Sequence, residues 1–163
     1  MSPNVELEIA SEHWAVLEDA EALARVAIEL ACSVTRTSLR EGAEVSVLLT
    51  DNAGISALNA QWRSQAKPTN VLSFPLAAPG RVSDALLLGD IVIAFETMRR
   101  EAEDEGKLLA HHYRHLVVHG FLHLIGFDHL EPTEADRMEA LERAILAKLS
   151  IDDPYALTAP LDS

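Results

Sequence analysis

The stretch from His115 to His129 constrains the fold of this chain more than any other. It reads HLVVHGFLHLIGFDH and holds four of the seven histidines. His119 and His123 are four residues apart, so on an α-helix they lie one turn apart on the same face. Gly126 follows them, and glycine ends a helix readily because it tolerates positive φ. The chain can then turn back and present His129 from outside the helix.

This arrangement of imidazoles favours a metal site. Two histidines on adjacent turns can reach one ion, because Zn–N bonds are about 2.0–2.1 Å long. Three protein ligands leave a fourth position for water, which is typical of a catalytic zinc site. We therefore predict that His119, His123 and His129 bind one Zn²⁺ per chain, although nickel, iron or cobalt would accept the same ligands. A fourth protein ligand, such as His115 or an acidic side chain, would instead make the site structural.

The zinc peptidases have the same ligand spacing together with a general base. Their helix reads His-Glu-x-x-His, in which the Glu is that base. Metzincins add a glycine and a third histidine at the positions that Gly126 and His129 occupy relative to His119. The residue after His119 is Gly120 in this chain. The ligands are therefore metzincin-like but the base is missing, which argues against peptide hydrolysis.

The other histidines have weaker claims to a metal role. His111 and His115 continue the i, i+4 row backwards, and we predict that they line or support the site. A tetrahedral site has no room for five imidazoles and a water. His13 and His112 are therefore expected to be ordinary surface or hydrogen-bonded residues.

The pattern of apolar residues outside the histidine stretch predicts an α+β fold. Strands are predicted at residues 4–10, 45–49, 71–74 and 86–94, and helices at 11–35, 51–62, 95–106, 108–125 and 132–149. Pro68 and Pro75 favour an edge position for the third strand, and Gly89 suggests a bulge or a close approach in the fourth. We predict a single domain over residues 1–163, with a mixed sheet of about four strands covered by helices and a loose tail at 151–163.

Charge bears on whether the partner is a nucleic acid. The net charge is −13, and phosphate binding usually depends on clustered Lys and Arg. The acidic excess, however, lies at the two ends of the chain. Residues 61–127 carry 7 basic and 7 acidic groups and contain every motif discussed here except His129. Charge therefore neither proves nor excludes a polyanionic substrate.

Composition favours a soluble, cytoplasmic protein. The single cysteine, Cys32, cannot form an internal disulfide and suits a reducing compartment. The N-terminal residues lack the basic and apolar regions of a signal peptide, and no apolar run is long enough to span a membrane.

Three ordered segments together resemble one known family. The stretch HGFLHLIGFDH at 119–129 resembles the histidine motif of the YbeY endoribonucleases, which are bacterial ribosomal-RNA maturation factors. Arg63 followed by PTNVLSFP at 68–75, and LGDIVI at 88–93, resemble further segments of that family in the same order. The resemblance runs from about residue 58 to 129.

The resemblance implies a zinc-dependent endoribonuclease specific for single-stranded RNA. It implies roles in small-subunit rRNA 3′-end maturation and ribosome quality control, on the ribosome and with ribosomal proteins or GTPases as candidate partners. His119, His123 and His129 carry over as metal ligands, and Arg63 carries over as the functional arginine near the metal. Many relatives have Asp where Asn70 stands and Tyr where Phe127 stands, so no role can rest on a hydroxyl at 127.

The residues also indicate a mechanism, with two points left open. A zinc ion bound by three neutral histidines keeps its charge and can activate a nucleophile. The role that the resemblance implies for Arg63 is to clamp phosphate oxygens through its planar fork, whereas the residue alone favours a surface salt bridge. The attacking group is either water or the ribose 2′-hydroxyl. Asp90 and Asp128 are the nearest candidates for the general base, although Asp128 more readily orients a ligand histidine. The competing functions are a zinc hydrolase of another class and a non-catalytic ribosome assembly factor with structural zinc.

Overall fold

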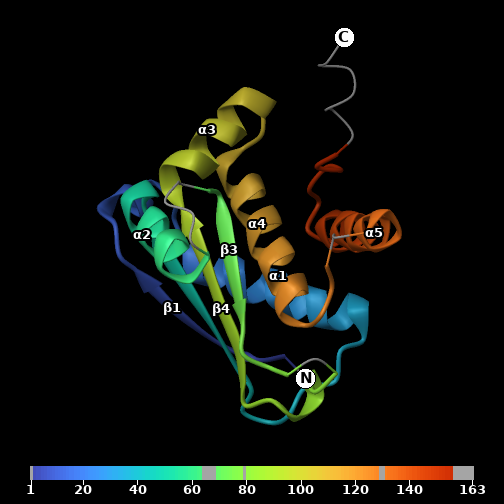
Figure 1. Ribbon diagram of the computed structural model, residues 1–163. Helices are drawn as coiled ribbons and strands as arrows, with labels where there is room; N and C mark the ends of the chain where they lie inside the picture. The colour runs from blue at the N-terminus through green and yellow to red at the C-terminus, as the bar shows by residue number, and fades with distance from the viewer. Residues whose placement is uncertain (1, 64–68, 79, 129–130, 156–163) are drawn as a thin grey trace.

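A four-stranded mixed sheet lies at the centre of the fold (Figure 1). The computed structural model describes residues 2–63, 69–78, 80–128 and 131–155, without the side chain of Arg63. The strands stand in the order β1 (Asn4–Ile9), β2 (Glu44–Thr50), β4 (Leu87–Ala94) and β3 (Val71–Pro75). The first three run parallel, and β3 pairs antiparallel with β4. The predicted mixed sheet is confirmed, and β3 lies at an edge, as its flanking prolines indicated.

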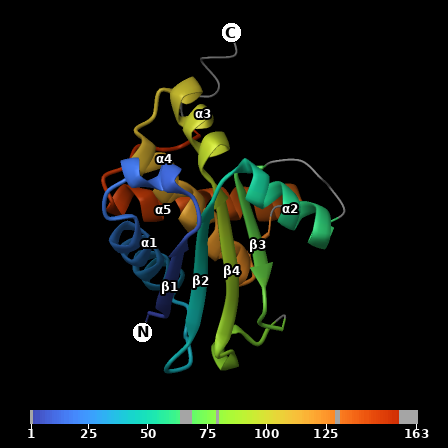
Figure 2. The ribbon, with the colours of Figure 1, turned by 90° about the vertical axis from the view of Figure 1, so that its left-hand side faces the viewer.

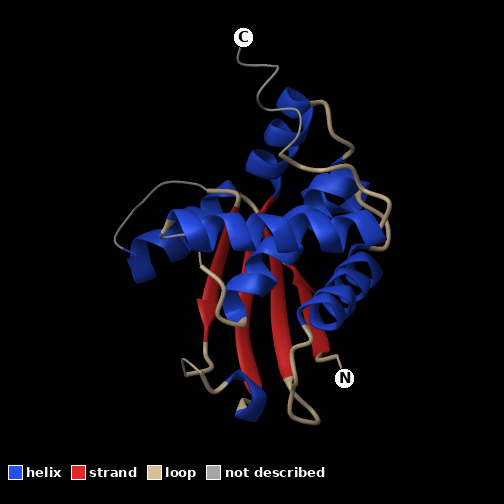
Figure 3. Ribbon diagram, turned by 90° about the vertical axis from the view of Figure 1, so that its right-hand side faces the viewer, coloured by secondary structure: helices blue, strands red, loops and turns tan. Residues whose placement is uncertain are grey.

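Helices cover the two faces of the sheet unequally. They are η1 (Glu12–Val16), α1 (Ala20–Thr35), α2 (Asn52–Arg63), η2 (Val82–Asp84), α3 (Phe95–Glu105), α4 (Leu109–Leu124) and α5 (Pro132–Lys148). One face is packed by α1 and α4, and α5 lies across these two helices as an outer layer (Figure 3). The opposite face is covered in part by α2 (Figure 2). The predicted α+β class is confirmed.

The larger core lies between the sheet and α1, α4 and α5. Val45, Val47 and Leu49 of β2 alternate into it, because successive strand residues point to opposite faces. The middle of α4 is buried nearly all round, since it packs against the sheet, α1, α3 and α5. A smaller cluster that includes Ile55 and Leu72 lies under α2. This packing fixes the position of the histidine-bearing helix α4.

The helix predicted over residues 11–35 is wrong in its first third. The chain forms the short 3₁₀ helix η1, capped by Ser11, and α1 begins only at Ala20, after Asp19 at φ +58°. Trp14 explains the break, because its side chain is buried and its Nε1–H donates to the carbonyl of Thr50 at 2.8 Å. This anchor fixes η1 against the end of β2.

Gly89 has the close-approach role that the sequence suggested. It has φ +143°, and a Cβ built on it would lie 2.4 Å from the carbonyl oxygen of Phe74. The register between β2 and β4 shifts there, since Glu44 pairs with Leu87 but Val45 pairs with Gly89. Both the bulge and the approach of β3 therefore require glycine at this position.

Residues 151–155 differ from the loose tail that was predicted to begin there. Ile151 is buried, the Lys107 ammonium donates to the carbonyl of Pro154 at 3.0 Å, and Arg143 pairs with Asp153. The remainder of that predicted tail, 156–163, lies outside the described residues. Among the helices of the described chain, none combines the length and apolarity that crossing a bilayer requires.

Candidate metal centre

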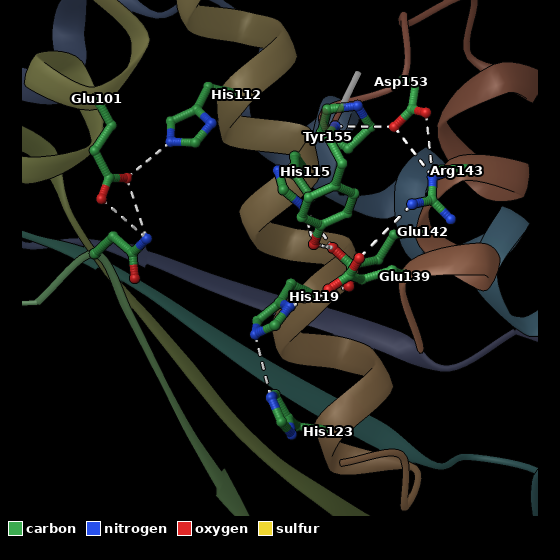
Figure 4. A network of polar contacts seen from close by, with 12 residues as sticks. Glu101, His112, His115, His119, His123, Glu139, Glu142, Arg143, Asp153 and Tyr155 are labelled. Carbon is green, nitrogen blue, oxygen red and sulfur yellow. Dashed lines mark hydrogen bonds and ion pairs between the residues drawn. The ribbon is translucent and has the colours of Figure 1, made fainter. Parts of the chain in front are cut away.

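Helix α4 brings two of the three predicted ligands together. His119 and His123 lie on one face, and their Nε2 atoms face each other at 3.2 Å (Figure 4). The rings are nearly perpendicular, with centroids 4.7 Å apart. In the metal-free protein one of these two nitrogens carries the proton and donates to the other. The helical spacing thus produces a pair of imidazole nitrogens directed at a common point.

The end of α4 reverses the chain as the sequence indicated. Gly126 has φ +108°, the N–H of Phe127 donates to the carbonyl of Leu122 at 2.9 Å, and that of Gly126 donates to the carbonyl of His123 at 3.2 Å. These bonds form a Schellman-type helix end, which suits glycine. The predicted third ligand, His129, lies outside the described residues. Among the described residues, no set of three potential ligands is placed to hold a metal.

A buried carboxylate from α5 supports this face of α4. Glu142 is 1% exposed, and its Oε2 accepts from His119 Nδ1 at 3.3 Å. Its Oε1 accepts from His115 Nε2 at 2.5 Å and from the Tyr155 hydroxyl at 2.7 Å. Burial acts to raise the pKa of Glu142, but the hydrogen bonds from the two histidines outweigh it and bring the pKa to about 2. Glu142 is therefore an ionised acceptor at neutral pH.

The partners of Glu142 are held as donors. Burial lowers the pKa of His115, so its neutral imidazole donates through Nε2. Burial and the neighbouring Glu142 raise the pKa of Tyr155, so its hydroxyl stays protonated. The predicted supporting role of His115 therefore has a physical partner in Glu142. Neither His115 nor His111 lines the cleft beside His119.

A second histidine–carboxylate pair ties α4 to α3. His112 is buried, its Nε2 bonds Glu101 Oε1 at 2.9 Å, and Asn70 at the start of β3 donates to the same carboxylate. This pair fixes the first half of α4. His13, also predicted to have no metal role, stacks on the ring of Phe95.

Gly120 is where α4 packs directly on the sheet. A Cβ built there would lie 2.8 Å from Ile91 Cγ2 and 3.2 Å from Ser73 Oγ. The position that carries the base in His-Glu-x-x-His therefore faces β3 and β4 in this protein. A glutamate has no room there, which gives the missing peptidase base a structural reason.

A cleft of about 990 Å³ opens beside His119 and His123. Asp128 is the single acidic residue among the described residues that line it. Apart from the two histidines and Asp128, the described lining residues carry no charge, and they are Thr37, Ser38, Thr69, Asn70, Val71, Leu72, Ser73, Pro75, Ala77, Ala78, Gly80, Val82, Ser83, Leu124, Ile125, Gly126 and Phe127. The exposed Arg137 has its guanidinium carbon 5.4 Å from the centre of the Phe127 ring. The cleft next to the histidines is thus largely uncharged.

The two candidate bases lie in different places. Asp128 lines the cleft with His119 and His123. Asp90 instead lines a hollow of about 900 Å³ on the opposite sheet face, together with Glu6, Glu8 and Trp62. Asp90 alternates with Ile91, which faces the α4 side, so strand geometry directs it away from the histidines. Only Asp128 remains a candidate for a role beside the metal ligands.

Arg63 is the last residue of α2, and its side chain lies outside what the structure describes. The segment that follows leads to Thr69 and Asn70, which both line the histidine cleft. The predicted proximity of the guanidinium to the metal remains a prediction.

The described pair His119 and His123 has a geometry that fits the predicted zinc ion. Two ligands of a tetrahedral zinc ion with bonds of about 2.0–2.1 Å lie roughly 3.3–3.4 Å apart. The 3.2 Å between the two Nε2 atoms is close to that separation. His119 Nδ1 is already bonded to Glu142, which leaves Nε2 as its coordinating atom.

Sequence reasoning missed Glu142 and Tyr155. Glu142 lies in the predicted last helix, where an acidic residue is ordinarily solvated. One signal could have found it: Met138, Ile145 and Leu146 form the buried stripe of α5, and Glu142 stands at the intervening helical position. A charge within an apolar stripe indicates a buried partner.

Comparisons with known proteins identify the family to which this chain is similar. A family model described as Endoribonuclease YbeY matches residues 7–150. Endoribonuclease YbeY of Rhodopseudomonas palustris strain BisB18 is 52% identical over 157 residues, covering 94% of this chain and 93% of that protein. The Methylocella silvestris protein of the same name is 48% identical over 155 residues, covering 95% and 87%. The solution structure of TM1509 from Thermotoga maritima has a TM-score of 0.55 at 21% identity, covers 90% and 91% of the two chains, and supports the fold.

Proposed function

Because the chain belongs to the Endoribonuclease YbeY family, we propose that it is a zinc-dependent endoribonuclease acting on single-stranded RNA. The family membership confirms the resemblance found in the three sequence segments. The observation that carries the zinc dependence is the pair of Nε2 atoms of His119 and His123, which face each other at 3.2 Å beside an open cleft. His129 is proposed as the third ligand of a single ion.

We assign separate roles in phosphodiester cleavage to the histidines and to Arg63. His119, His123 and His129 would hold the zinc ion, which would supply positive charge to acidify water and polarise a phosphoryl oxygen. Arg63 is proposed to clamp the phosphate, because its guanidinium stays charged and matches two oxygens at once. His119 cannot act as the base through Nδ1, since that atom is bonded to Glu142.

The cleft supports an RNA substrate despite the net charge of −13. Its lining offers Ser38, Thr69 and Ser83 as neutral hydrogen-bonding groups, and Arg137 adds a cation at Phe127. Proteins bind single-stranded nucleic acids through polar and positively charged groups that contact the sugar-phosphate backbone, together with exposed aromatic rings that stack on the bases. The ends of the RNA products identify the attacking group, because a 2′,3′-cyclic phosphate forms only when the 2′-hydroxyl attacks.

The proposed physiological substrate is the 3′ region of small-subunit ribosomal RNA, in rRNA maturation and ribosome quality control. The names of the similar proteins support RNA cleavage, and the proposal extends it to the ribosome, with ribosomal proteins or GTPases as partners. A cytoplasmic location follows from such a substrate.

The test is cleavage of a labelled single-stranded fragment from the 3′ end of that RNA. Wild type, chelator-treated wild type with and without added zinc, and the variants His123→Ala, Arg63→Ala and His111→Ala are compared at matched purity. His111→Ala is the control, since it removes an imidazole of the same helix outside the cleft. We expect cleavage by wild type, zinc-restored wild type and His111→Ala only.

Each other outcome has a defined meaning. Equal cleavage in all samples indicates a contaminating nuclease and contradicts the assignment. Absence of cleavage throughout, with zinc bound, favours a non-catalytic ribosome assembly factor with structural zinc. Loss of zinc from Arg63→Ala would show that Arg63 supports the metal site instead of holding phosphate.

A further inference from the structure

Glu142 is a charged residue in a place where charge is costly. It lies on the inner face of α5, on the same side as the fully buried Ile145 and Leu146, and is 1% exposed. A buried carboxylate is tolerated when hydrogen bonds replace its lost water. Both of its oxygens have such partners: Oε1 bonds His115 and Tyr155, and Oε2 bonds His119. The carboxylate thus joins α5 to the ligand-bearing face of α4.

The bond to His119 determines which nitrogen of that ring faces the site. A carboxylate only accepts, so Nδ1 carries a proton and donates it to Oε2 whenever the imidazole has a single proton. Nε2 is then without a proton and faces His123 Nε2 at 3.2 Å. This is the tautomer that coordination through Nε2 requires. The ring is held in the tautomer and orientation of a ligand before any metal arrives.

Residues that follow α5 in the chain hold the Glu142 carboxylate in place. The Tyr155 hydroxyl donates to Oε1 at 2.7 Å, and the backbone N–H of Tyr155 donates to Asp153 Oδ1 at 2.9 Å. Arg143 donates to the same Asp153 carboxylate at 3.1–3.2 Å, and its guanidinium lies 5.5 Å from the Tyr155 ring centre. Figure 4 shows these residues on the side of Glu142 away from His123. The chain after α5 therefore braces Glu142 against His119.

We propose that Glu142 is a positioning residue that orients His119 for metal binding. The inference rests on the proposed zinc site and adds the residue that prepares one of its ligands. Carboxylates that hold the second nitrogen of a ligating histidine typically change metal affinity by about 10–100-fold when they are replaced. A carboxylate that only filled the core would leave zinc affinity unchanged in a folded variant.

The first test measures the zinc dissociation constant by competition with a chromophoric chelator. Glu142→Gln keeps the shape of the side chain and removes its charge. Glu139→Gln is the matched control, because it removes the same charge from the same helix at a partly exposed residue. Its ion-pair partner Arg143 keeps the two hydrogen bonds to Asp153, so the support of Glu142 stays in place. We expect affinity about 10–100-fold weaker for Glu142→Gln and within about twofold of wild type for Glu139→Gln. Circular dichroism and thermal unfolding of the metal-free proteins show whether each variant is folded.

The outcomes separate the inference from the function on which it rests. Folded Glu142→Gln that binds zinc as tightly as wild type overturns the positioning role and leaves the zinc site intact. Wild type that binds no zinc overturns the proposed metal function itself. Equal weakening by Glu139→Gln would mean that general charge on α5, and not the contact with His119, controls affinity, and would also overturn the inference.

A second measurement needs no variant and covers the case in which Glu142→Gln fails to fold. Long-range ¹H–¹⁵N spectra of imidazoles in metal-free wild type report which nitrogen of His119 carries the proton. We expect a fixed Nδ1–H tautomer, whereas free histidine prefers Nε2–H. An Nε2–H tautomer, or a rapid average of the two, would overturn the inference.

Discussion

The packing of Gly120 against the sheet predicts that adding one methyl group there destabilises the fold. A Cβ at this position would lie 2.8 Å from Ile91 Cγ2 and 3.3 Å from Ile91 Cγ1. Ile91 is fully buried in the interior strand β4, and both atoms are attached directly to its Cβ. A β-branched side chain is stiff at χ1, so neither atom can turn away without moving the strand or helix.

Two opposing effects set the magnitude. Alanine is better than glycine in a helix by about 1 kcal/mol. Overpacking a tight core by a methyl group costs about 1–3 kcal/mol. An overpacking cost of roughly 2 kcal/mol minus a helix-propensity gain of roughly 1 kcal/mol leaves a net loss of about 1 kcal/mol in the free energy of unfolding of Gly120→Ala. For a chain of this length that lowers the melting temperature by about 2–4 °C.

Urea unfolding followed by circular dichroism measures this loss in two backgrounds. Ile91→Ala removes the obstructing atoms and is itself destabilising by about 2–5 kcal/mol. In that background Gly120→Ala should become stabilising by up to about 1 kcal/mol, because of the helix preference of alanine. The close contact that remains, with Ser73 Oγ at 3.2 Å, requires a shift of only a few tenths of an ångström. The effect of Gly120→Ala on the free energy of unfolding thus changes sign between the two backgrounds, which corresponds to a coupling energy of about 2 kcal/mol between positions 120 and 91. Gly120→Ala that stabilises the wild-type background, or destabilises both backgrounds equally, would refute the packing argument.

Other regions yield three further predictions. Gly89→Ala would place a side chain at positive φ with its Cβ 2.4 Å from the Phe74 carbonyl oxygen. We expect the free energy of unfolding, measured in urea, to fall by at least about 3 kcal/mol. A fall of less than about 1 kcal/mol would contradict this. Burial opposes ionisation of Glu101, but hydrogen bonds from His112 and Asn70 lower its pKa below 4.5. The stabilisation by ionised Glu101 is therefore complete above about pH 4.5 and disappears as the pH falls through the lower pKa of the folded state. The difference in free energy of unfolding between wild type and Glu101→Gln should then vanish in acid. A difference that stays constant down to about pH 3 would contradict the interaction between Glu101 and His112. Burial raises the pKa of Cys32 to about 11, so a thiol reagent at pH 8 should modify it only after unfolding; rapid modification of the native protein would show that the thiol is accessible.

The sequence was sufficient for features that depend on local spacing. The i, i+4 pair His119 and His123 and the helix end at Gly126 follow from helical geometry, and the structure reproduces both. The edge position of β3 followed from the inability of proline to donate to a ladder. Each of these depends on residues within a few positions of one another.

Features that depend on distant contacts escaped sequence reasoning. Glu142 is 23 residues from His119 in the chain, and their contact arises only because α5 lies across α4. The break before α1 depends on Trp14 reaching the end of β2, which no local propensity records. Gly120 was informative in the sequence as a missing base, but its physical reason is the contact with Ile91 of β4. The place of Asp90 likewise depends on which face of β4 the helix α4 covers, because apolar residues lie on both faces of that strand.

Zinc content per chain tests the central claim most directly. Elemental analysis is made on purified wild type and on His119→Ala, His123→Ala, His129→Ala and His111→Ala, each shown to be folded. The account predicts about one zinc ion per chain in wild type and in His111→Ala, and little or none in the other three. Wild type without zinc, or undiminished zinc in the variants of the facing pair His119 and His123, would contradict it.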